Sequence, residues 1–136
     1  MVRPLMTDTV FLAQKALPAD ADDIAVADDL LDTLKAHEDG CVGMAANMIG
    51  VNKAIIVFDN DGTPCEMFNP VIVYRKGLYL AEEGCLSLEG VRPCTRYEEI
   101  EVDYLDSNFR KQHGKYTGWT AQIIQHEVDH CNGIVI

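Results

Sequence analysis

Hydrophobic positions near the start of the chain recur at the spacing of an α-helix. Residues 19–40 are acidic, and their apolar side chains fall three or four positions apart, which predicts a helix with one buried face. Asp20 or Asp22 is expected to cap its start, and Gly40 is expected to end it. The carboxylates then form the solvated face. The apolar positions are Ile24, Ala27, Leu31 and Leu34.

The middle of the chain is typical of strands. Residues 53–59 form a short apolar run that ends in the turn sequence Asn-Asp-Gly. Residues 66–77 and 77–88 predict two further strands separated by a glycine break. Residues 96–106 alternate apolar and polar side chains, which predicts a half-exposed antiparallel strand. The apolar members of that alternation are Ile100, Val102 and Tyr104.

A second helix is predicted near the end of the chain, over residues 117–133. Thr117 is placed to cap its start, and Gly133 is placed to stop it. The order helix, strands, helix favours an α+β fold with antiparallel sheet over alternating β/α units. The length of 136 residues and a hydrophobic content of 48% predict one domain, residues 1–136, with one real core.

Charge and composition narrow the functional classes. The net charge of −11 disfavours binding to nucleic acid, because an acidic surface repels phosphates. There is no apolar run long enough to cross a membrane and no signal-peptide pattern, so we expect a cytoplasmic protein. Five cysteines without a CxxC pair argue against a disulfide framework.

The sequence HEVDH, from His126 to His130, carries the clearest chemical signal. Residues four apart lie on one face of a helix, so two imidazoles there can bind one metal ion, with Glu127 near enough to act as a general base. The alternative is a pair of surface histidines on an acidic helix. The apolar residues of the preceding AQIIQ favour a buried helix and therefore the metal site.

A catalytic metal site usually has a third protein ligand. The segment EEGCLS offers Cys85, which follows a glycine and two carboxylates. A single cysteine is more often a small buried hydrophobic residue than a ligand. The two histidines downstream make Cys85 the preferred candidate, because the other four cysteines have no comparable context.

Taken together, HEVDH, EEGCLS and GCVGMAANMIG resemble the three motifs of the peptide deformylase family, HExxH, EGCxS and GxGxAAxQ. The resemblance runs from about Leu31 to the end of the chain and includes Asn69-Pro70. It implies a deformylase-like α+β fold, with antiparallel sheets packed around a central HExxH helix. It also implies a hydrolase that removes the formyl group from formyl-methionyl nascent peptides and releases formate. Proximity to the ribosome is implied by the resemblance alone.

The resemblance assigns roles to individual residues. It implies that Cys85, His126 and His130 hold one divalent metal ion per chain, Fe2+ in the cell and Zn2+ or Ni2+ in preparations, with Glu127 as the general base. The backbone N–H of Leu86 matches the family's donor to the formyl oxygen. Gly43 matches a glycine that lines the substrate channel, and Arg92 matches an arginine on the substrate side, with a plain surface arginine as the alternative.

Two positions depart from the family motif. Cys41 stands at the first glycine of GxGxAAxQ, and Met48 stands at the glutamine whose side chain donates a hydrogen bond to the developing oxyanion. Methionine has no such donor. Neighbouring Asn47 carries an amide, but its side chain is expected to point elsewhere. Three alternatives therefore stay open: an active deformylase, an amidohydrolase for another acyl group, and a catalytically silent relative that binds metal or ligand.

We expect the substrate pocket to lie between the HExxH helix, the Cys85 segment and the segment from Gly43 to Met48. An apolar wall is expected to hold the methionine side chain of the substrate. The candidates for that wall are Val42, Met44, Ile124 and Val128, each of which also suits an ordinary core.

Overall fold

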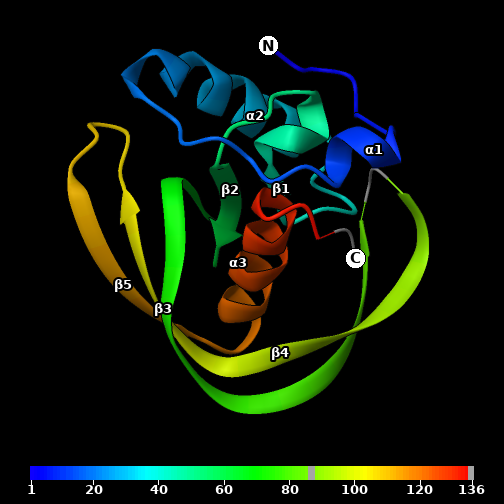
Figure 1. Ribbon diagram of the computed structural model, residues 1–136, viewed down its shortest axis with the longest axis vertical. Coiled ribbons are helices and arrows are strands. Elements are labelled where there is room, and N and C mark those ends of the chain that lie inside the picture. The colour runs from blue at the N-terminus through cyan, green and yellow to red at the C-terminus, as the bar shows by residue number, and fades with distance from the viewer. Residues whose placement is uncertain (86–87, 135–136) are drawn as a thin grey trace.

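The computed structural model describes residues 1–85 and 88–134, and side chains at 1–84 and 90–134. Its strands form one antiparallel sheet in the order β1-β2-β3-β4-β5, and the sheet curves around helix α3 (Figure 1). This confirms the expected α+β fold with antiparallel sheet around the HExxH helix. The strands are β1 (Gly43–Ala45), β2 (Ile55–Asn60), β3 (Thr63–Cys85), β4 (Leu88–Leu105) and β5 (Lys111–Thr117). The helical elements are α1 (Thr9–Leu12), η1 (Ala21–Asp23), α2 (Ile24–Ala36), η2 (Ala46–Ile49) and α3 (Gly118–Cys131).

The acidic stretch folds into η1 and α2. Asp20 caps η1, because its carboxylate accepts from the Asp22 backbone N–H at 2.9 Å while its own N–H donates to Asp23. The predicted stop at Gly40 is wrong: α2 ends at Ala36, and the residues after it form a turn. The predicted face packs on the core: Ala27 and Leu34 are buried, and Ile24 and Leu31 are partly buried against the same cluster. Leu30, which the spacing did not single out, is fully buried as well.

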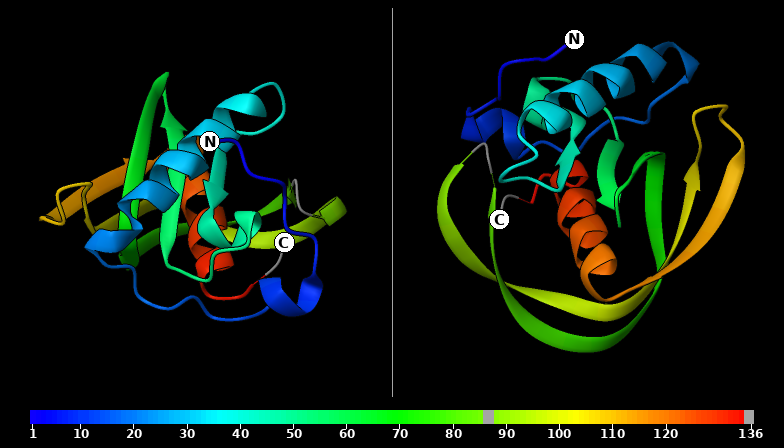
Figure 2. Two further views of the ribbon diagram at one scale, coloured as in Figure 1. Left: turned by 90° about the horizontal axis from the view of Figure 1, so that it is seen from above. Right: turned by 180° about the vertical axis from the view of Figure 1, so that it is seen from behind.

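Strand β2 separates two hydrophobic cores. Ile55 and Val57 face the cluster under α2, while Ile56 and Phe58 face the cluster under α3. Successive side chains of a strand point to opposite faces, so a strand covered on both sides is apolar throughout. This explains the unbroken run in the sequence. Figure 2 shows α2 and α3 on the two sides of β2.

The predicted glycine break between two strands is wrong, because β3 runs continuously through it. Gly77 has φ of +82° and stays in register with β4, opposite Glu98. A Cβ at Gly77 would lie 3.0 Å from the Cβ of Glu98, so the glycine permits a close approach rather than a turn. Register shifts near Val71 and Ile72 help to bend the long β3–β4 ribbon beneath α3 (Figure 1).

Helix α3 ends where the sequence predicts. Gly133 has φ of +75°, its N–H donates to the His130 carbonyl, and the Ile134 N–H donates to the Asp129 carbonyl. These two bonds form a Schellman motif, which favours glycine at this position. A Cβ at Gly133 would also lie 2.4 Å from the Ala13 carbonyl oxygen. At the other end Thr117 takes the N-cap position, but its side chain makes no capping bond in the structure described.

Gln125 fixes the middle of α3 to strand β4. Its amide nitrogen donates to the Tyr97 carbonyl at 2.9 Å, and its amide oxygen accepts from the Tyr97 N–H at 2.8 Å. Both bonds are made by a side chain that is almost fully buried. The pair sets the rotation of α3 against the sheet and therefore the direction of the histidines. In the part of the chain that the structure describes, no helix has the length and hydrophobicity to cross a bilayer.

Asn69 connects the strands to the N-terminal segment. Its amide nitrogen donates to the Ala19 carbonyl at 3.0 Å, and its amide oxygen accepts from the Ala19 N–H at 2.7 Å. The residue has φ of +52°, a conformation that asparagine tolerates better than most residues. The next residue, Pro70, is buried. The Asn-Pro pair therefore holds the segment that leads into α2.

Asn69→Ala is expected to lower the free energy of unfolding by about 3–4 kcal/mol. Two hydrogen bonds are lost at about 1 kcal/mol each, and an alanine at positive φ adds about 1–2 kcal/mol. Asn69→Gly loses the same bonds but tolerates the backbone, so its loss should be smaller. Urea denaturation of both variants measures the difference. Equal stability of wild type and Asn69→Ala would contradict this role.

Candidate metal and active site

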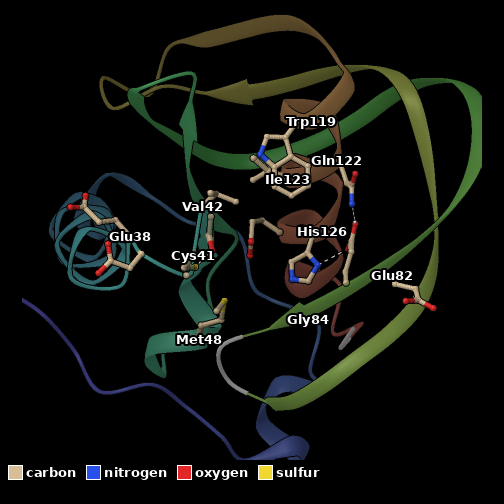
Figure 3. Close-up of a pocket in the computed structure, with 15 residues that line it drawn as sticks. Glu38, Cys41, Val42, Met48, Glu82, Gly84, Trp119, Gln122, Ile123 and His126 are labelled. Carbon is tan, nitrogen blue, oxygen red and sulfur yellow. Dashed lines mark hydrogen bonds and ion pairs between the residues drawn. The ribbon is translucent and has the colours of Figure 1, made fainter.

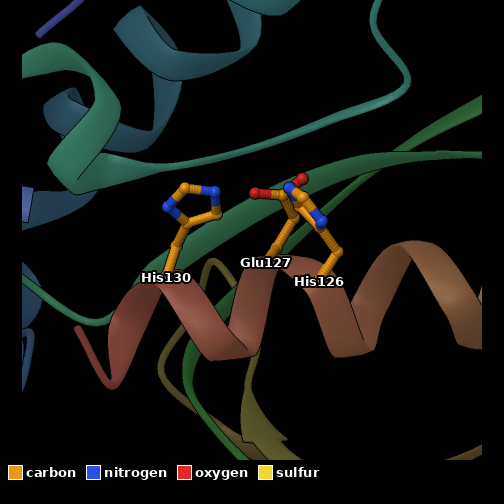
Figure 4. Close-up of side chains that lie close together, drawn as sticks. All are labelled: His126, Glu127 and His130. Carbon is orange, nitrogen blue, oxygen red and sulfur yellow. The ribbon is translucent and has the colours of Figure 1, made fainter. Parts of the chain in front are cut away.

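Three side chains of α3 converge on one point. His126, Glu127 and His130 bring one ring nitrogen or carboxylate oxygen each within 4.8 Å of one another (Figure 4). The two imidazole rings lie 5.0 Å apart between centroids, one turn of helix from each other. The structure thus brings the two predicted histidine ligands together with the predicted general base.

The inner members of this group are deeply buried and incompletely hydrogen-bonded. Glu127 is 4% exposed and His130 is fully buried. In the described structure neither ring nitrogen of His130 has a hydrogen-bond partner, and neither does Glu127 Oε1. Burial lowers the pKa of His130 to about 3, so its ring is neutral at physiological pH. Burial also raises the pKa of Glu127 to about 7.

His126 is oriented by Glu83 on β3. Its Nδ1 lies 2.7 Å from Glu83 Oε1, and a carboxylate can only accept, so Nδ1 carries the proton. In the neutral ring the lone pair is then on Nε2, and a lone pair on nitrogen is what a metal ion binds. Desolvation would raise the pKa of Glu83, but hydrogen bonds from His126 and Arg96 outweigh it and lower the pKa to about 2.

Arg96 extends the arrangement back to the helix. This arginine is 3% exposed and binds Glu83 with two nitrogens, the shorter contact being 2.6 Å. A third nitrogen donates to Asp129 Oδ2 at 2.7 Å, and Gln122 donates to Glu83 at 2.8 Å. The network therefore begins and ends on α3 and passes through both long strands. Its members are His126, Glu83, Arg96, Asp129 and Gln122.

The donor set fits a divalent metal ion. Two imidazoles one helical turn apart and a neighbouring carboxylate are ligands that zinc, iron and nickel accept, and one of the unpaired nitrogens of His130 would gain a partner. The predicted third ligand is Cys85, whose backbone ends β3. Its side chain, and Leu86 as a whole, lie outside the described residues.

A cavity of about 460 Å³ lies over this group (Figure 3). It opens between α3, the segment from Gly43 to Met48 and the end of β3 near Gly84, as the sequence predicts. A Cβ at Gly43 would lie 3.0 Å from Glu127 Oε2, so the glycine lets the β1 backbone pass directly over the carboxylate. The residues that line the cavity are Glu38, Asp39, Gly40, Cys41, Val42, Gly43, Met48, Glu82, Glu83, Gly84, Trp119, Gln122, Ile123, His126 and Glu127.

Only one of the four predicted wall residues is in this lining, Val42. Met44, Ile124 and Val128 are buried in the two cores instead, because the strand and the helix turn those side chains away from the cavity. Ile123 and Trp119 provide apolar lining that the sequence analysis missed. They lie three and seven positions before His126, which places them on the same face of the helix. This spacing could have identified them from the sequence.

Met48 lies in the cavity wall at 1% exposure, where the family motif places its glutamine. Its sulfur accepts from the Ala45 N–H at 3.4 Å and offers no donor to a ligand. Asn47 cannot replace it, since its amide nitrogen donates to the His130 carbonyl at 2.9 Å. Cys41 also lines the cavity, and its thiol donates to the Gly43 carbonyl at 3.0 Å.

Arg92 is exposed and pairs with Glu83 in the β-ladder, outside the cavity lining. The structure therefore does not bring it to the site, and its substrate-side role stays a prediction. Sequence reasoning missed Arg96, the charge that holds Glu83. A lone arginine in an alternating strand gives no signal of that contact.

A buried HExxH helix under a cavity, with an oriented histidine and a glutamate whose Oε1 lacks a hydrogen bond among the described residues, defines the class of metal-dependent hydrolases. Comparison with known proteins identifies the family. The family model described as "Polypeptide deformylase" matches residues 5–136. The chain is 52% identical to a peptide deformylase of Clostridium beijerinckii, with all of both chains covered.

Solved structures agree with this assignment. The peptide deformylase of Thermus thermophilus has a TM-score of 0.86 at 35% identity, covering 99% of this chain and 83% of that one. A class I type b peptide deformylase from Acinetobacter baumannii, bound to Met-Ala-Ser, has a TM-score of 0.88 at 29% identity, covering 99% and 97%. The chain belongs to the peptide deformylase family.

Glu83→Gln is expected to weaken metal binding about 10- to 100-fold, because it removes the charge that orients His126. Glu82→Gln is the matched control, since Glu82 is the adjacent carboxylate and makes no described hydrogen bond. Competition with a chromogenic chelator measures both affinities. Equal affinity in the two variants would show that Glu83 does not support the site.

Proposed function

We propose that this chain removes the formyl group from N-formyl-methionyl peptides and releases formate. It would do so with one divalent metal ion held by Cys85, His126 and His130. The observation that carries the proposal is the buried Glu127, which lines the cavity between His126 and His130 and whose Oε1 has no hydrogen-bond partner in the described structure. The full-length identity to a named peptide deformylase and the tripeptide held by the Acinetobacter relative support it.

The cavity suits the proposed substrate. Its volume of about 460 Å³ is within the range of small-molecule sites, and Val42 and Ile123 give it an apolar side for a methionine side chain. Gly43 brings the β1 backbone close to Glu127, so that main-chain groups can align an extended peptide beside the carboxylate. The backbone N–H of Leu86 is the proposed donor to the formyl oxygen, and Arg92 is a proposed contact on the substrate side.

Glu127 has the properties of a proton carrier. Burial raises its pKa to about 7, so the same carboxylate can take a proton from the attacking water and give one to the leaving amine near neutral pH. A divalent ion held by Cys85, His126 and His130 would supply a nucleophile at neutral pH and would polarise the carbonyl. Fe2+ is the metal we propose for the cell, while the ligand set also accepts Zn2+ and Ni2+.

Met48 sets this chain apart within the family motif. With methionine there, the oxyanion loses one side-chain donor, which typically costs about 100- to 1000-fold in rate. The unreactive thioether therefore favours a slower enzyme, or one tuned to another acyl group. A silent relative fits less well, because such a protein has no use for the buried, costly Glu127 carboxylate.

The substrate also suggests where the protein works. Formylated peptides are nascent chains, so we place the enzyme in the cytoplasm close to translating ribosomes, acting on the peptide rather than on nucleic acid. The net charge of −11 supports the last point. The family match over residues 5–136 supports a single catalytic domain.

Glu127→Ala should abolish formate release from formyl-Met-Ala-Ser while close to one metal ion per chain is retained. The carboxylate moves the proton, whereas the histidines hold the metal. Formate release is assayed after anaerobic loading with Fe2+, and metal content is measured by elemental analysis. If wild type and Glu127→Ala are equally slow, the protein is a silent relative.

Met48→Gln should raise kcat by up to about 100-fold, because it restores a donor where the oxyanion forms. Met48→Leu is the matched control, since it keeps the apolar volume without any donor. Both are compared with wild type in the same formate assay. No gain in Met48→Gln would mean that the oxyanion is stabilised by other groups in this chain.

A further inference from the structure

Cys41 is a nucleophilic side chain in the cavity wall that the proposed reaction does not use. The family motif has glycine at this position, so the thiol is a departure from the motif. Its sulfur donates to the Gly43 carbonyl at 3.0 Å, and the residue is half-buried. It packs against the core under α2 and also lines the cavity, so the thiol lies at the boundary between the two.

The space beside Cys41 can take a small molecule. The cavity has a volume of about 460 Å³, and a Cβ placed on the preceding Gly40 would meet no described atom within 4 Å beyond its chain neighbours. Figure 3 shows Cys41 on the segment between α2 and β1, and His126 on α3. A group attached to the Cys41 sulfur can therefore extend into the cavity without a shift of the backbone.

A second, independent observation indicates that this cavity receives a ligand. Glu127 lines it at 4% exposure, and its Oε1 has no hydrogen-bond partner in the described structure. Gly43, whose carbonyl accepts from the Cys41 thiol, also passes over this carboxylate, since a Cβ at Gly43 would lie 3.0 Å from Glu127 Oε2. A molecule that binds against Glu127 therefore comes close to the Cys41 sulfur.

The other cysteines with described side chains lack this setting. Cys65 and Cys94 are half-buried but are absent from the described lining of the cavity. Burial raises the pKa of both thiols, that of Cys94 to about 11. Cys131 is 6% exposed and packs in the core under α3. Because the thiolate is the reactive form, we expect these three residues to react slowly.

We infer that Cys41 is a site of reversible modification by small disulfides, and that the attached group closes the cavity to peptides. The Cys41 thiolate attacks one sulfur of the disulfide, whose S–S bond breaks while a new S–S bond joins Cys41 to one half of the molecule. The other half leaves as a thiolate and takes up the proton that Cys41 gave up. An excess of small thiol reverses the exchange. The inference rests on the proposed function only in the choice of peptide that is shut out.

Labelling kinetics test the site without turnover. Protein loaded with Ni2+, which avoids the oxidation of iron, is treated with dithiodipyridine, a small neutral disulfide. Peptide mapping by mass spectrometry then locates the label over time. Cys41 should react at least about 10-fold faster than Cys65 and Cys94, because burial keeps those two thiols protonated. Excess dithiothreitol should remove the label. A label that reaches any other cysteine as fast as Cys41 overturns the inference.

A bound peptide tests whether Cys41 reacts inside the cavity. Met-Ala-Ser at about ten times its dissociation constant leaves roughly one molecule in eleven open, so labelling of Cys41 should slow about 10-fold. Cys65 is the matched control, because its thiol also donates to a backbone carbonyl two residues away but lies outside the described lining. Its rate should not change. An unchanged rate at Cys41 with the peptide bound overturns the closure.

The converse experiment measures peptide binding after labelling. Treated wild type should bind Met-Ala-Ser more weakly than untreated wild type, and dithiothreitol should restore the affinity. In Cys41→Ala the same treatment should leave the affinity unchanged, whereas Cys65→Ala should respond as wild type does. If treatment weakens binding equally in Cys41→Ala and wild type, the effect belongs to another residue and the inference fails.

The two proposals fail in different ways. If the protein binds Met-Ala-Ser but releases no formate from the formylated peptide, the proposed function fails while every labelling experiment still decides the inference. If the peptide does not bind at all, the proposed function also fails, and the selectivity for Cys41 over Cys65 decides the inference alone. If formate is released but Cys41 is not labelled first, only the inference about Cys41 fails.

Discussion

The structure depends on one buried helix whose inner face is polar. Helix α3 lies inside the curved sheet, and its polar side chains must find partners there because water is excluded. Gln125 bonds to the Tyr97 backbone, His126 to Glu83, and Asp129 to Arg96. Each bond reaches a long strand, so the sheet holds both the position and the rotation of the helix. Within this frame the nitrogens of His130 and one oxygen of Glu127 stay unpaired in the described structure.

The unpaired atoms of His130 and Glu127 lower the stability of the fold but leave groups available for chemistry at the site. A buried polar atom without a partner destabilises the folded chain, and the two hydrophobic cores on either side of β2 offset that cost. A metal ion would reduce this cost by binding one nitrogen of His130. Ion binding and folding are therefore coupled in this protein. The stability of the metal-free protein and its affinity for metal therefore both depend on the same unsatisfied polar atoms.

Much of this arrangement could be predicted from the sequence, because it depends on the local spacing of side chains. The spacing of His126 and His130, the stop at Gly133 and the alternation at Ile100 and Val102 all predicted what the structure has. The errors arose from contacts between distant segments. Gly77 was predicted to separate two strands, because the sequence does not show which residue lies opposite it. The reason for a glycine inside this strand is its close contact with Glu98 across the β3–β4 ladder. Met44 and Ile124 were assigned to the pocket because apolar character alone does not distinguish a cavity wall from a core.

The close passage of Gly43 over Glu127 has a consequence for biosynthesis. The glycine belongs to an early strand and the glutamate to a late helix, and neither position is defined until both exist. The long β3–β4 ribbon between them must remain uncovered on its concave side until α3 has left the ribosome (Figure 1). An emerging copy of this chain therefore has no active site of its own.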